Sequence, residues 1–276
     1  MIYNLEYFKN IIPKRPQDAH KGTFGHVLNI AGSNFYSGAA YFSSIAPLMV
    51  GCGKVTLLSA ETVLRTVSAL SPDIILMPLN KFKKEKINDF QAISIGCGLS
   101  QDEASVKLFK GIINIFTDEN MPIVIDADGL NILSAMKIKL PINTILTPHP
   151  RELSRLMETE IGNILSEPEF WAQKCCEKYN CTTVLKLHKT IISNCENEIY
   201  INNTGNTALA HGGSGDVLCG MIAGLLAQGL NCFEASCLAV YLHGLAGEFA
   251  SEILTEYSVL ASDLINYIPK AIKTIL

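Results

Sequence analysis

Short apolar runs that alternate with longer segments of helical spacing limit the fold of this chain more than any other feature of its sequence. The runs are rich in β-branched residues and end at glycine, proline or small polar residues: His26–Ala31, Lys54–Ser59, Ala92–Gly96, Pro122–Asp126, Asn143–Thr147 and Thr182–Leu187. The helical segments between them include Ser37–Cys52, Gln101–Ile115, Arg151–Glu158 and Glu167–Tyr179. Strands that alternate with helices predict an α/β fold in which a mostly parallel sheet is covered on both faces.

The pattern changes towards the carboxyl-terminal part of the chain. Two short β-like runs, Thr190–Ser193 and Glu198–Ile201, follow the preceding strand closely and predict a small antiparallel β addition. Three successive helices are then expected to cover one face of the sheet: Asp216–Gln228, Phe233–Ser251 and Ser258–Thr274. Because the sequence contains no internal repeat, low-complexity segment or linker-like stretch, we expect residues 1–276 to form a single domain.

Composition and charge disfavour several classes of partner. The 276 residues are 48% hydrophobic and 17% charged, which is typical of a compact globular protein. With 22 Lys and Arg against 26 Asp and Glu, the net charge of −4 argues against nucleic-acid and anionic-membrane partners. The basic run Lys81–Lys86 is expected to be a solvated surface loop. The amino terminus does not resemble a signal peptide and no apolar run is long enough to span a membrane, so we expect a cytoplasmic protein.

The cysteine content also agrees with a cytoplasmic protein. There are nine, an odd number, and they lack a paired C-x-x-C framework. We therefore expect reduced thiols that fill helix faces. A metal site at Cys175, Cys176 and Cys181 is the less favoured alternative.

The segment His211–Asp216 is the most specific indication of function. Its residues Gly212, Gly213, Ser214 and Gly215 form a glycine-dense turn that opens an apolar helix. Free N–H groups and the positive helix end favour an anion such as phosphate there. Asp216 at the same helix start would either cap the helix or take a proton from a substrate hydroxyl. The pairing of an anion site with a carboxylate predicts group-transfer chemistry.

Five other glycine-rich or polar loops follow predicted strands, at the sheet edge where ligands gather in α/β folds. They are Gly32–Ser33 with Gly38–Ala40, then Gly96–Gly98, Asp126–Gly129, Thr147–Pro150 and Lys186–Thr190. Each loop taken alone is also explained as an ordinary turn, a helix start or a rigid corner. Neither the G-x-G-x-x-G spacing of a dinucleotide fold nor the spacing of a P-loop is present, so both lose support.

Individual residues in these loops carry further expectations. Ala39 lacks side-chain bulk at a helix start, which would let a flat ligand approach the backbone, although close helix packing explains it equally well. His149 lies between two prolines that would hold its imidazole rigidly, in a structural or a functional role. Lys186 ends an apolar strand and is expected to reach a phosphate or a carboxylate at the rim of the sheet. The polar segment Asn202–Ala210 is either a mobile loop beside a ligand or simply a loop.

Taken together and in this order, the segments resemble the NAD(P)H-hydrate dehydratase family of the ribokinase-like superfamily. The motifs that carry the resemblance are Lys21–Gly25, Ala31–Ala40, Thr147–Glu152, Gly212–Asp216 and Tyr241–Gly244. The resemblance implies a three-layer α/β/α sandwich and the removal of water from the (6S)-hydrates of NADH and NADPH, a metabolite repair reaction. The reaction would be driven by ADP, which yields AMP and phosphate, or by ATP. It would proceed by phosphorylation of the ring hydroxyl and loss of phosphate.

The same resemblance implies roles for individual residues. Asp216 would act as the base, while the N–H groups of the glycine turn hold the transferring phosphoryl group. The residues that would contact the hydrated nicotinamide nucleotide are Ala39, Gly98, His149 and Asp216. Those that would contact the adenine nucleotide are Lys186, Leu187, His188, Lys189, Thr190 and Gly215. Mg²⁺ would accompany the nucleotide without a dedicated carboxylate cage, and Asp126 or Glu152 would either assist it through water or be purely structural.

Two departures from the family pattern qualify these expectations. Leu187 stands where the family has a glycine, so the adenylate loop is expected to differ or to bind nucleotide more weakly. Ser100 replaces the last glycine of the family's Gly-Pro-Gly-Leu-Gly. The resemblance also implies a homo-oligomer, a homotetramer, and an epimerase supplied by a separate polypeptide. The alternatives are a ribokinase-like kinase of a vitamin precursor, of the hydroxyethylthiazole or hydroxymethylpyrimidine type, and a nucleotide-binding protein that has lost turnover.

Overall fold

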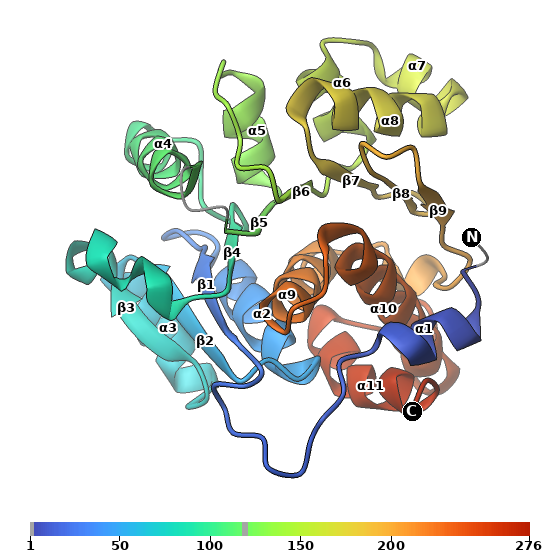
Figure 1. The fold of residues 1–276 in the computed structure, drawn as a ribbon, viewed down its shortest axis with the longest axis horizontal. Helices are drawn as coiled ribbons and strands as arrows, with labels where there is room; N and C mark the ends of the chain where they lie inside the picture. The colour runs from blue at the N-terminus through green and yellow to red at the C-terminus, as the bar shows by residue number, and fades with distance from the viewer. Residues whose placement is uncertain (1–2, 118–120) are drawn as a thin grey trace.

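The computed structural model describes residues 3–117 and 121–276. Within them, nine strands form one sheet in the order β3-β2-β1-β4-β5-β6-β7-β8-β9. Their bounds are β1 His26–Ile30, β2 Lys54–Ser59, β3 Ile75–Pro78, β4 Ala92–Ile95, β5 Ile123–Ile125, β6 Thr144–Leu146, β7 Thr182–Leu185, β8 Ile191–Ser193 and β9 Ile199–Ile201. The strands from β3 to β7 pair in parallel, and β8 and β9 add antiparallel at one edge (Figure 1).

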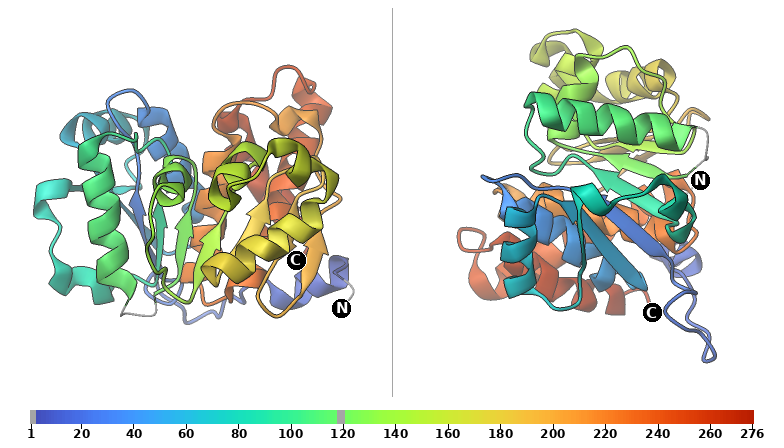
Figure 2. Two further views of the ribbon diagram at one scale, coloured as in Figure 1. Left: turned by 90° about the horizontal axis from the view of Figure 1, so that it is seen from above. Right: turned by 90° about the vertical axis from the view of Figure 1, so that its left-hand side faces the viewer.

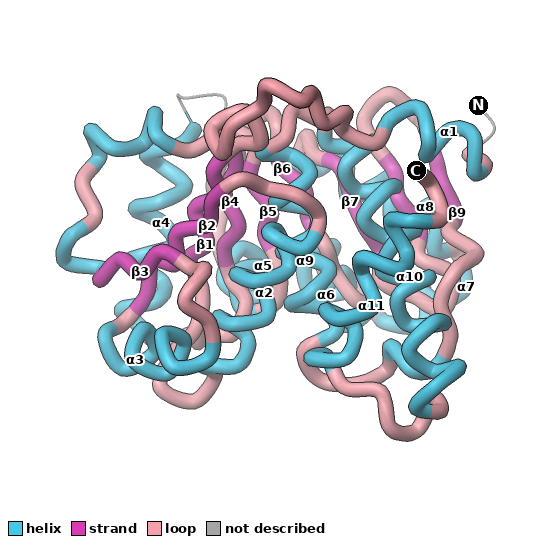
Figure 3. The backbone as a smooth tube through the Cα atoms, turned by 90° about the horizontal axis from the view of Figure 1, so that it is seen from below, coloured by secondary structure: helices cyan, strands magenta, loops and turns pink. Residues whose placement is uncertain are grey.

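Helices cover both faces of this sheet (Figure 2). Their bounds are α1 Leu5–Ile11, α2 Ser37–Met49, α3 Glu61–Leu70, α4 Glu103–Thr117, α5 Asp128–Ser134, α6 Pro150–Met157, α7 Ile161–Ser166, α8 Pro168–Tyr179, α9 Ser214–Ala227, α10 Cys232–Leu254 and α11 Ala261–Lys273. One apolar cluster joins Val27 and Val124 to α2, α9, α10 and α11, which lie on the near side of the strands in Figure 3. A second joins Leu28 and Ile123 to α4, α5, α6 and α8.

The burial of the strands explains why they read as continuous apolar runs. Every residue of β1, β4, β5, β6 and β7 is buried, because helices cover both faces. Neighbours along a strand therefore enter different cores, as Val27 and Leu28 do. The buried Asn29 donates to Ser43 and Ser44 of α2, both at 2.8 Å, and accepts from Ser94 of β4 at 2.8 Å. These bonds hold the middle of α2 against the sheet.

The predicted α/β architecture is confirmed. The six predicted parallel strands form with ends that differ by at most two residues, and the antiparallel addition and the three final helices are present. The sequence did not predict β3, an edge strand that is only partly buried and ends in Pro78. It also did not name α1, α3 and α7, and it left open a helix start at Asp128, where α5 begins. Helices α1, α5 and α7 are only 7, 7 and 6 residues long, and α3 contains two pairs of β-branched residues, Thr62 with Val63 and Thr66 with Val67.

We expected a loop at Lys81–Lys86, and this is wrong as regards the secondary structure of the segment. Two 3₁₀ helices lie there, η1 Leu79–Lys81 and η2 Lys84–Asp89. The segment is anchored by Ile87 and Phe90, which are buried beneath it. The basic side chains of Lys81, Lys83 and Lys84 are exposed, as predicted.

The cysteines are free thiols, and most are buried. Cys175 and Cys176 lie inside α8, and Cys181 precedes β7. Cys175 and Cys181 fill the apolar layer between helix and sheet, in accordance with the expectation of packing thiols, whereas the Cys176 thiol hydrogen-bonds Thr183 and Ser193. Among the described residues, no helix is both long enough and apolar enough to cross a membrane.

Candidate active site

The predicted loops meet at the carboxyl edge of the parallel strands. Those that follow β1, β4, β5, β6 and β7 share this edge because the strands run in the same direction. The start of α9 lies against them: a Cβ atom built on Gly215 would be 3.6 Å from Nζ of Lys186 and 3.9 Å from Oδ2 of Asp126. The glycine turn, the end of β5 and the end of β7 therefore form one site.

The backbone of the glycine turn has a conformation that residues other than glycine rarely adopt. Gly213 is the N-cap of α9 with φ of +95°, and a Cβ there would be 2.7 Å from the Cβ of Ala261. Glycine removes both the strain and the clash. No side chain accepts a hydrogen bond from the first turn at this cap. The first N–H of the helix that donates to a backbone carbonyl is that of Val217, which donates to the carbonyl oxygen of Gly213. The N–H groups before it are available to an anion.

His243 of α10 holds the turn from behind. Its Nε2 lies 3.0 Å from the carbonyl oxygen of Ser214 and 3.2 Å from Oγ of the same residue. Burial lowers the pKa of His243 to about 4, so the ring is neutral near neutral pH. A neutral ring with its proton on Nε2 donates to the carbonyl. This contact fixes the first turn of α9 in place.

Asp216 lies in the first turn of α9 rather than at the cap position that the sequence left open. Burial, together with the nearby Asp126 carboxylate, raises the pKa of Asp216 to about 6, against the lowering effects of a hydrogen bond from the Cys97 thiol and the charge of Lys186. A carboxylate with a raised pKa holds a proton more firmly than an exposed one. Asp216 is thus suited to accept a proton from a hydroxyl near neutral pH.

Lys186 lies between two buried carboxylates. Its Nζ is 2.6 Å from Oδ1 of Asp126 and 3.9 Å from Oε2 of Glu152. Burial opposes the charge of Lys186, but the two carboxylates outweigh it and raise the pKa of the ammonium above its usual value. Burial also raises the pKa of Glu152, to about 7. The expectation that Lys186 reaches a carboxylate at the rim of the sheet is confirmed, and the ammonium lies beside the anion turn.

Ala39 and Gly98, two of the residues expected on the substrate side, lie in contact. Gly98 has φ of +60°, and a Cβ there would be 2.8 Å from the Cβ of Ala39 and 2.6 Å from that of Tyr36. Ser100 nearby adopts φ of +74°, a left-handed conformation, and its N–H donates to Oδ2 of Asp128 at 2.9 Å. The serine therefore adopts, with some strain, a left-handed backbone of the kind that favours glycine.

His149 has a clear structural role. Its Nδ1 accepts from the N–H groups of Arg151 at 3.1 Å and Glu152 at 3.3 Å, so it caps α6. The Glu152 carboxylate returns the contact by accepting from the N–H of His149 at 2.8 Å. Burial, together with the Lys186 charge, lowers the pKa of His149. The ring also lines a cavity, which it shares with Lys186 and not with Ala39 or Gly98.

That cavity measures about 580 Å³ and borders the anion turn. Five of the six residues expected on the nucleotide side line it, namely Lys186, Leu187, His188, Thr190 and Gly215, whereas Lys189 is exposed outside it. Asn202 and Thr204 close another side, and the hydroxyl of Thr204 donates to the Tyr241 carbonyl at 2.9 Å. The polar segment Asn202–Ala210 is therefore fastened to α10. The volume of the cavity suits a small-molecule ligand.

Leu187 has an ordinary backbone conformation, and the weaker nucleotide binding expected of it stays a prediction. Residues with positive φ in the described chain include Ser100 and Ala127 but not Leu187. The backbone at residue 187 is one that leucine adopts without strain. Its side chain packs against the apolar cluster of β7 and α8 and also borders the cavity.

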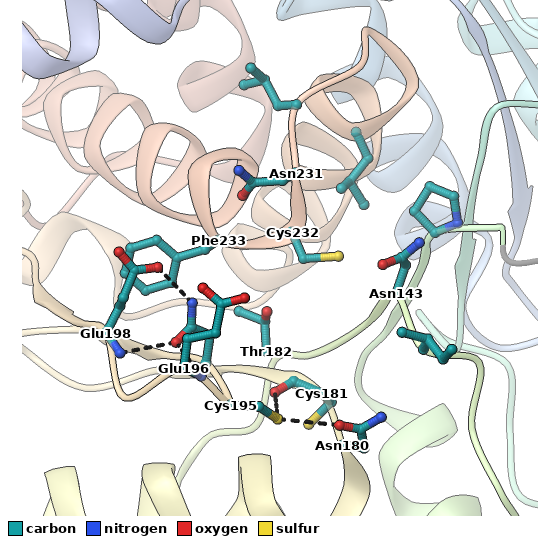
Figure 4. A pocket seen from close by; sticks show the side chains of 15 residues that line it. Asn143, Asn180, Cys181, Thr182, Cys195, Glu196, Glu198, Asn231, Cys232 and Phe233 are labelled. Atoms are coloured by element: carbon teal, nitrogen blue, oxygen red, sulfur yellow. Dashed lines mark hydrogen bonds between the residues drawn. The ribbon is translucent and has the colours of Figure 1, made fainter.

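Several features of the site were not predicted. Sequence reasoning did not find Cys97 beside Asp216 or His243 behind Ser214, because neither contact follows from sequence spacing. The buried pair of Asp126 and Lys186 had a local signal, a charged residue at the end of each of two apolar strands. A second cavity, of about 500 Å³, lies at the opposite, amino end of the strands and is lined mainly by amides, thiols and carboxylates (Figure 4).

Comparison with known proteins decides the family. A family model described as NAD(P)H-hydrate dehydratase matches residues 27–270. The chain belongs to this family. The ADP-dependent (S)-NAD(P)H-hydrate dehydratase of Neisseria meningitidis is 39% identical over 258 residues, which cover 91% of this chain and 86% of that protein. The chain spans about half the length of the bifunctional NAD(P)H-hydrate repair enzyme of Moorella thermoacetica, which is 33% identical and 54% covered.

A solved structure of the family has the same fold. The ADP/ATP-dependent NAD(P)H-hydrate dehydratase of Bacillus subtilis, co-crystallised with ATP and Mg²⁺, superposes with a TM-score of 0.88 at 28% identity. The superposition covers 100% of this chain and 98% of that one. The three-layer ribokinase-like α/β/α sandwich is thereby confirmed.

Proposed function

We propose that this chain catalyses the nucleotide-dependent dehydration of the (6S)-hydrates of NADH and NADPH, and is thus a hydro-lyase of metabolite repair. The observation that carries the proposal is the position of Asp216, whose pKa is raised to about 6, in the first turn of α9 beside unpaired N–H groups and Lys186. Membership of the dehydratase family favours this reaction over a vitamin-precursor kinase and over an inactive nucleotide-binding protein.

In the proposed reaction, the terminal phosphoryl group of ADP is transferred to the ring hydroxyl of the hydrate. Asp216 takes the hydroxyl proton as the new phosphorus–oxygen bond forms, and AMP leaves. The N–H groups of Gly213, Ser214 and Gly215, with Lys186 beside them, stabilise the negative charge of the group in transit. The carbon–oxygen bond then breaks as the ring-nitrogen lone pair expels phosphate, and loss of a proton from the adjacent carbon restores the dihydronicotinamide.

The two ligands are assigned to two sides of Asp216. The cavity lined by Lys186, Leu187, His188 and Thr190 would take the adenine nucleotide, and Lys189, which is exposed outside the cavity, would contact it from solvent. The contact between Ala39 and Gly98 would form the floor for the hydrated nicotinamide. His149 lines the cavity assigned to the nucleotide. Its imidazole would therefore lie between the nucleotide and the hydrate when it contacts the hydrate.

Mg²⁺ fits this site only in part. The ion prefers oxygen ligands and keeps several waters. Asp126 bonds Lys186 through Oδ1, and its Oδ2 lies on the side of Gly215. Asp126 would therefore hold Mg²⁺ through water, with Glu152 behind Lys186. When bound, the ion would neutralise charge on the nucleotide phosphates.

The remaining parts of the proposal concern the setting of the enzyme. Residues 1–276 would act as one catalytic domain in the cytoplasm and assemble as a homo-oligomer, a homotetramer. The bifunctional relatives are named as repair enzymes and are about twice as long as the matched region. An NAD(P)H-hydrate epimerase on a separate polypeptide would supply the (S)-form to this chain.

The test is a repair assay. Purified protein is incubated with hydrated NADH or NADPH, Mg²⁺ and either ADP or ATP, and the absorbance of the restored dihydronicotinamide is followed. We expect recovery that depends on nucleotide, with AMP and phosphate formed in equal amounts when ADP is used. Absence of recovery with both nucleotides would overturn the proposal.

A further inference from the structure

Two buried thiols and a carboxylate converge beneath the anion turn. The sulfur atoms of Cys97 and Cys219 and a carboxylate oxygen of Asp126 all lie within 4.8 Å of one another. The three residues come from different elements, namely the loop after β4, the end of β5 and the second turn of α9. All are buried, with exposed fractions of 1%, 0% and 1% for Cys97, Cys219 and Asp126. The proposed reaction uses neither thiol.

The spacing is close to that of a tetrahedral metal site. Zn–S bonds are about 2.3 Å long, so two ligand atoms on one tetrahedral ion are about 3.8 Å apart. The group needs to contract by about 1 Å at most to reach that separation. Two thiolates with carboxylate oxygens favour Zn²⁺ or Cd²⁺ over Mg²⁺, because soft sulfur ligands select thiophilic ions.

Asp216 is the neighbouring carboxylate that would complete the group. Asp216 accepts a hydrogen bond from the Cys97 thiol and precedes Cys219 by one helical turn, although it is not one of the three residues whose ligand atoms lie within 4.8 Å of one another. Its carboxylate would turn towards the group to bind the same ion. Oδ2 of Asp126 lies on the side of Gly215, 3.9 Å from a Cβ atom built there.

The neighbouring cation does not prevent binding. Lys186 is the partner of Asp126, but it also lies 3.9 Å from Glu152, so it keeps a carboxylate partner when Asp126 turns to a metal. The positive charge of Lys186 offsets part of the excess negative charge that two thiolates and two carboxylates would leave around one divalent ion. Binding releases the two thiol protons to solvent.

We propose that Cys97, Cys219 and Asp126, completed by Asp216, bind one thiophilic divalent cation, Zn²⁺ or Cd²⁺, and that this ion inhibits the enzyme. Inhibition follows because the ion occupies the carboxylate that would accept the substrate proton. This second part rests on the proposed function, whereas binding itself does not.

Binding is tested with Cd²⁺, because thiolate-to-cadmium charge transfer gives an ultraviolet band. The full chain is reduced with a phosphine, stripped with a chelator and titrated in the presence of excess Mg²⁺. Cys219→Ala and Cys97→Ala remove one ligand each, and Cys195→Ala removes an exposed thiol as the matched control. Circular dichroism and thermal unfolding establish that each variant is folded.

We expect the wild type and Cys195→Ala to bind one tight equivalent of Cd²⁺ that Cys219→Ala and Cys97→Ala lose or bind at least about ten-fold more weakly. The proposal is overturned if folded Cys219→Ala and Cys97→Ala both keep the tight equivalent and its band. It is also overturned if Cys195→Ala alone loses them, because the ion is then held at the surface.

Inhibition is tested in the repair assay with Zn²⁺. Each variant is compared with its own activity without zinc, and we expect the zinc concentration for half-inhibition to rise at least about ten-fold in Cys219→Ala but not in Cys195→Ala. A chelator should restore wild-type activity. Equal zinc sensitivity in Cys219→Ala overturns the inhibition. A wild type without turnover in the absence of zinc counts instead against the proposed function, and the cadmium titration still decides the site.

Discussion

The two ends of the central sheet carry cavities of similar size and very different chemistry. The cavity at the amino end measures about 500 Å³ and borders Asn180, Cys195 and Glu196 (Figure 4). That at the carboxyl end measures about 580 Å³ and borders Lys186 and Gly215. The cavity at the carboxyl end lies against a buried ion pair and an open helix start. Among the described residues, the cavity at the amino end borders neither of these features. Volume is therefore a poor guide to the reacting centre, and buried, paired charge is a better one.

The starts of α9 and α10 show the difference most directly. At the amino end, the side chain of Asn231 caps α10 by accepting from the N–H of Glu234 at 2.9 Å. At the carboxyl end, the cap of α9 is Gly213, which has no side chain to offer. One helix thus satisfies its own first turn, whereas the other leaves N–H groups for a ligand.

The largest effect is expected from Asp216→Asn at the carboxyl end. The amide has nearly the shape of the carboxylate but cannot take the hydroxyl proton, so we expect kcat to fall on the order of 10³-fold while ADP still binds. The repair assay and nucleotide titration measure the two effects. Glu196→Gln is the matched change at the amino-end cavity, and its kcat should equal that of the wild type. Near-normal turnover of Asp216→Asn would show that Asp216 is not the base, and the functional difference between the two ends of the sheet would lose its main support.

The next effect is expected on stability, from Lys186→Met. The substitution leaves Asp126 and Glu152 buried without their cation, and breaking a buried pair in this way costs about 3 kcal/mol. Denaturant unfolding at neutral pH measures it. Lys107→Met is the control, because its ion pair with Glu103 is exposed and should contribute about 0.5 kcal/mol or less. Equal losses in the two variants would mean that the buried cluster contributes no more than a surface pair.

The sequence could predict the parts of the site that carry local signals. A glycine-dense helix start and a lysine at the end of an apolar strand led to Gly213, Asp216 and Lys186. Contacts that depend on packing could not be found in this way, such as the approach of Cys97 to Asp216.

Two replaced family glycines show the same limit. Ser100 takes a left-handed conformation with φ of +74°, whereas Leu187 does not have a positive φ. A sequence shows which residue replaces the glycine but not whether the backbone at that position needs glycine's freedom. Likewise, the prolines around His149 predicted a rigid corner, and its capping of α6 became visible only in the structure.

A smaller effect with a defined pH range is expected from His243, which supports the open helix start. Its folded pKa of about 4 lies below the unfolded value near 6.5, so the unfolded chain binds this proton first. The contribution is therefore fully present above pH 6.5 and is lost as the pH falls towards 4, by about 3 kcal/mol at most.

Unfolding free energies of the wild type and His243→Gln at several pH values test this. We expect the variant to lose part of the decline between pH 6.5 and 4, since glutamine does not titrate, and the exposed His188→Gln to keep it in full. If His243→Gln declines as steeply as the wild type, another group is responsible.

The smallest effect is expected at the amino end, from Asn231→Ala. Removing the side chain frees the N–H of Glu234 in the first turn of α10, and loss of such a cap costs about 1 kcal/mol of unfolding free energy. Both helix starts are then without a side-chain cap, yet only that of α9 combines open N–H groups with a buried lysine and a carboxylate of raised pKa. We therefore expect unchanged kcat and KM for ADP in the repair assay. A changed KM would show that the amino-end cavity communicates with nucleotide binding, and the division between the two ends of the sheet would no longer hold.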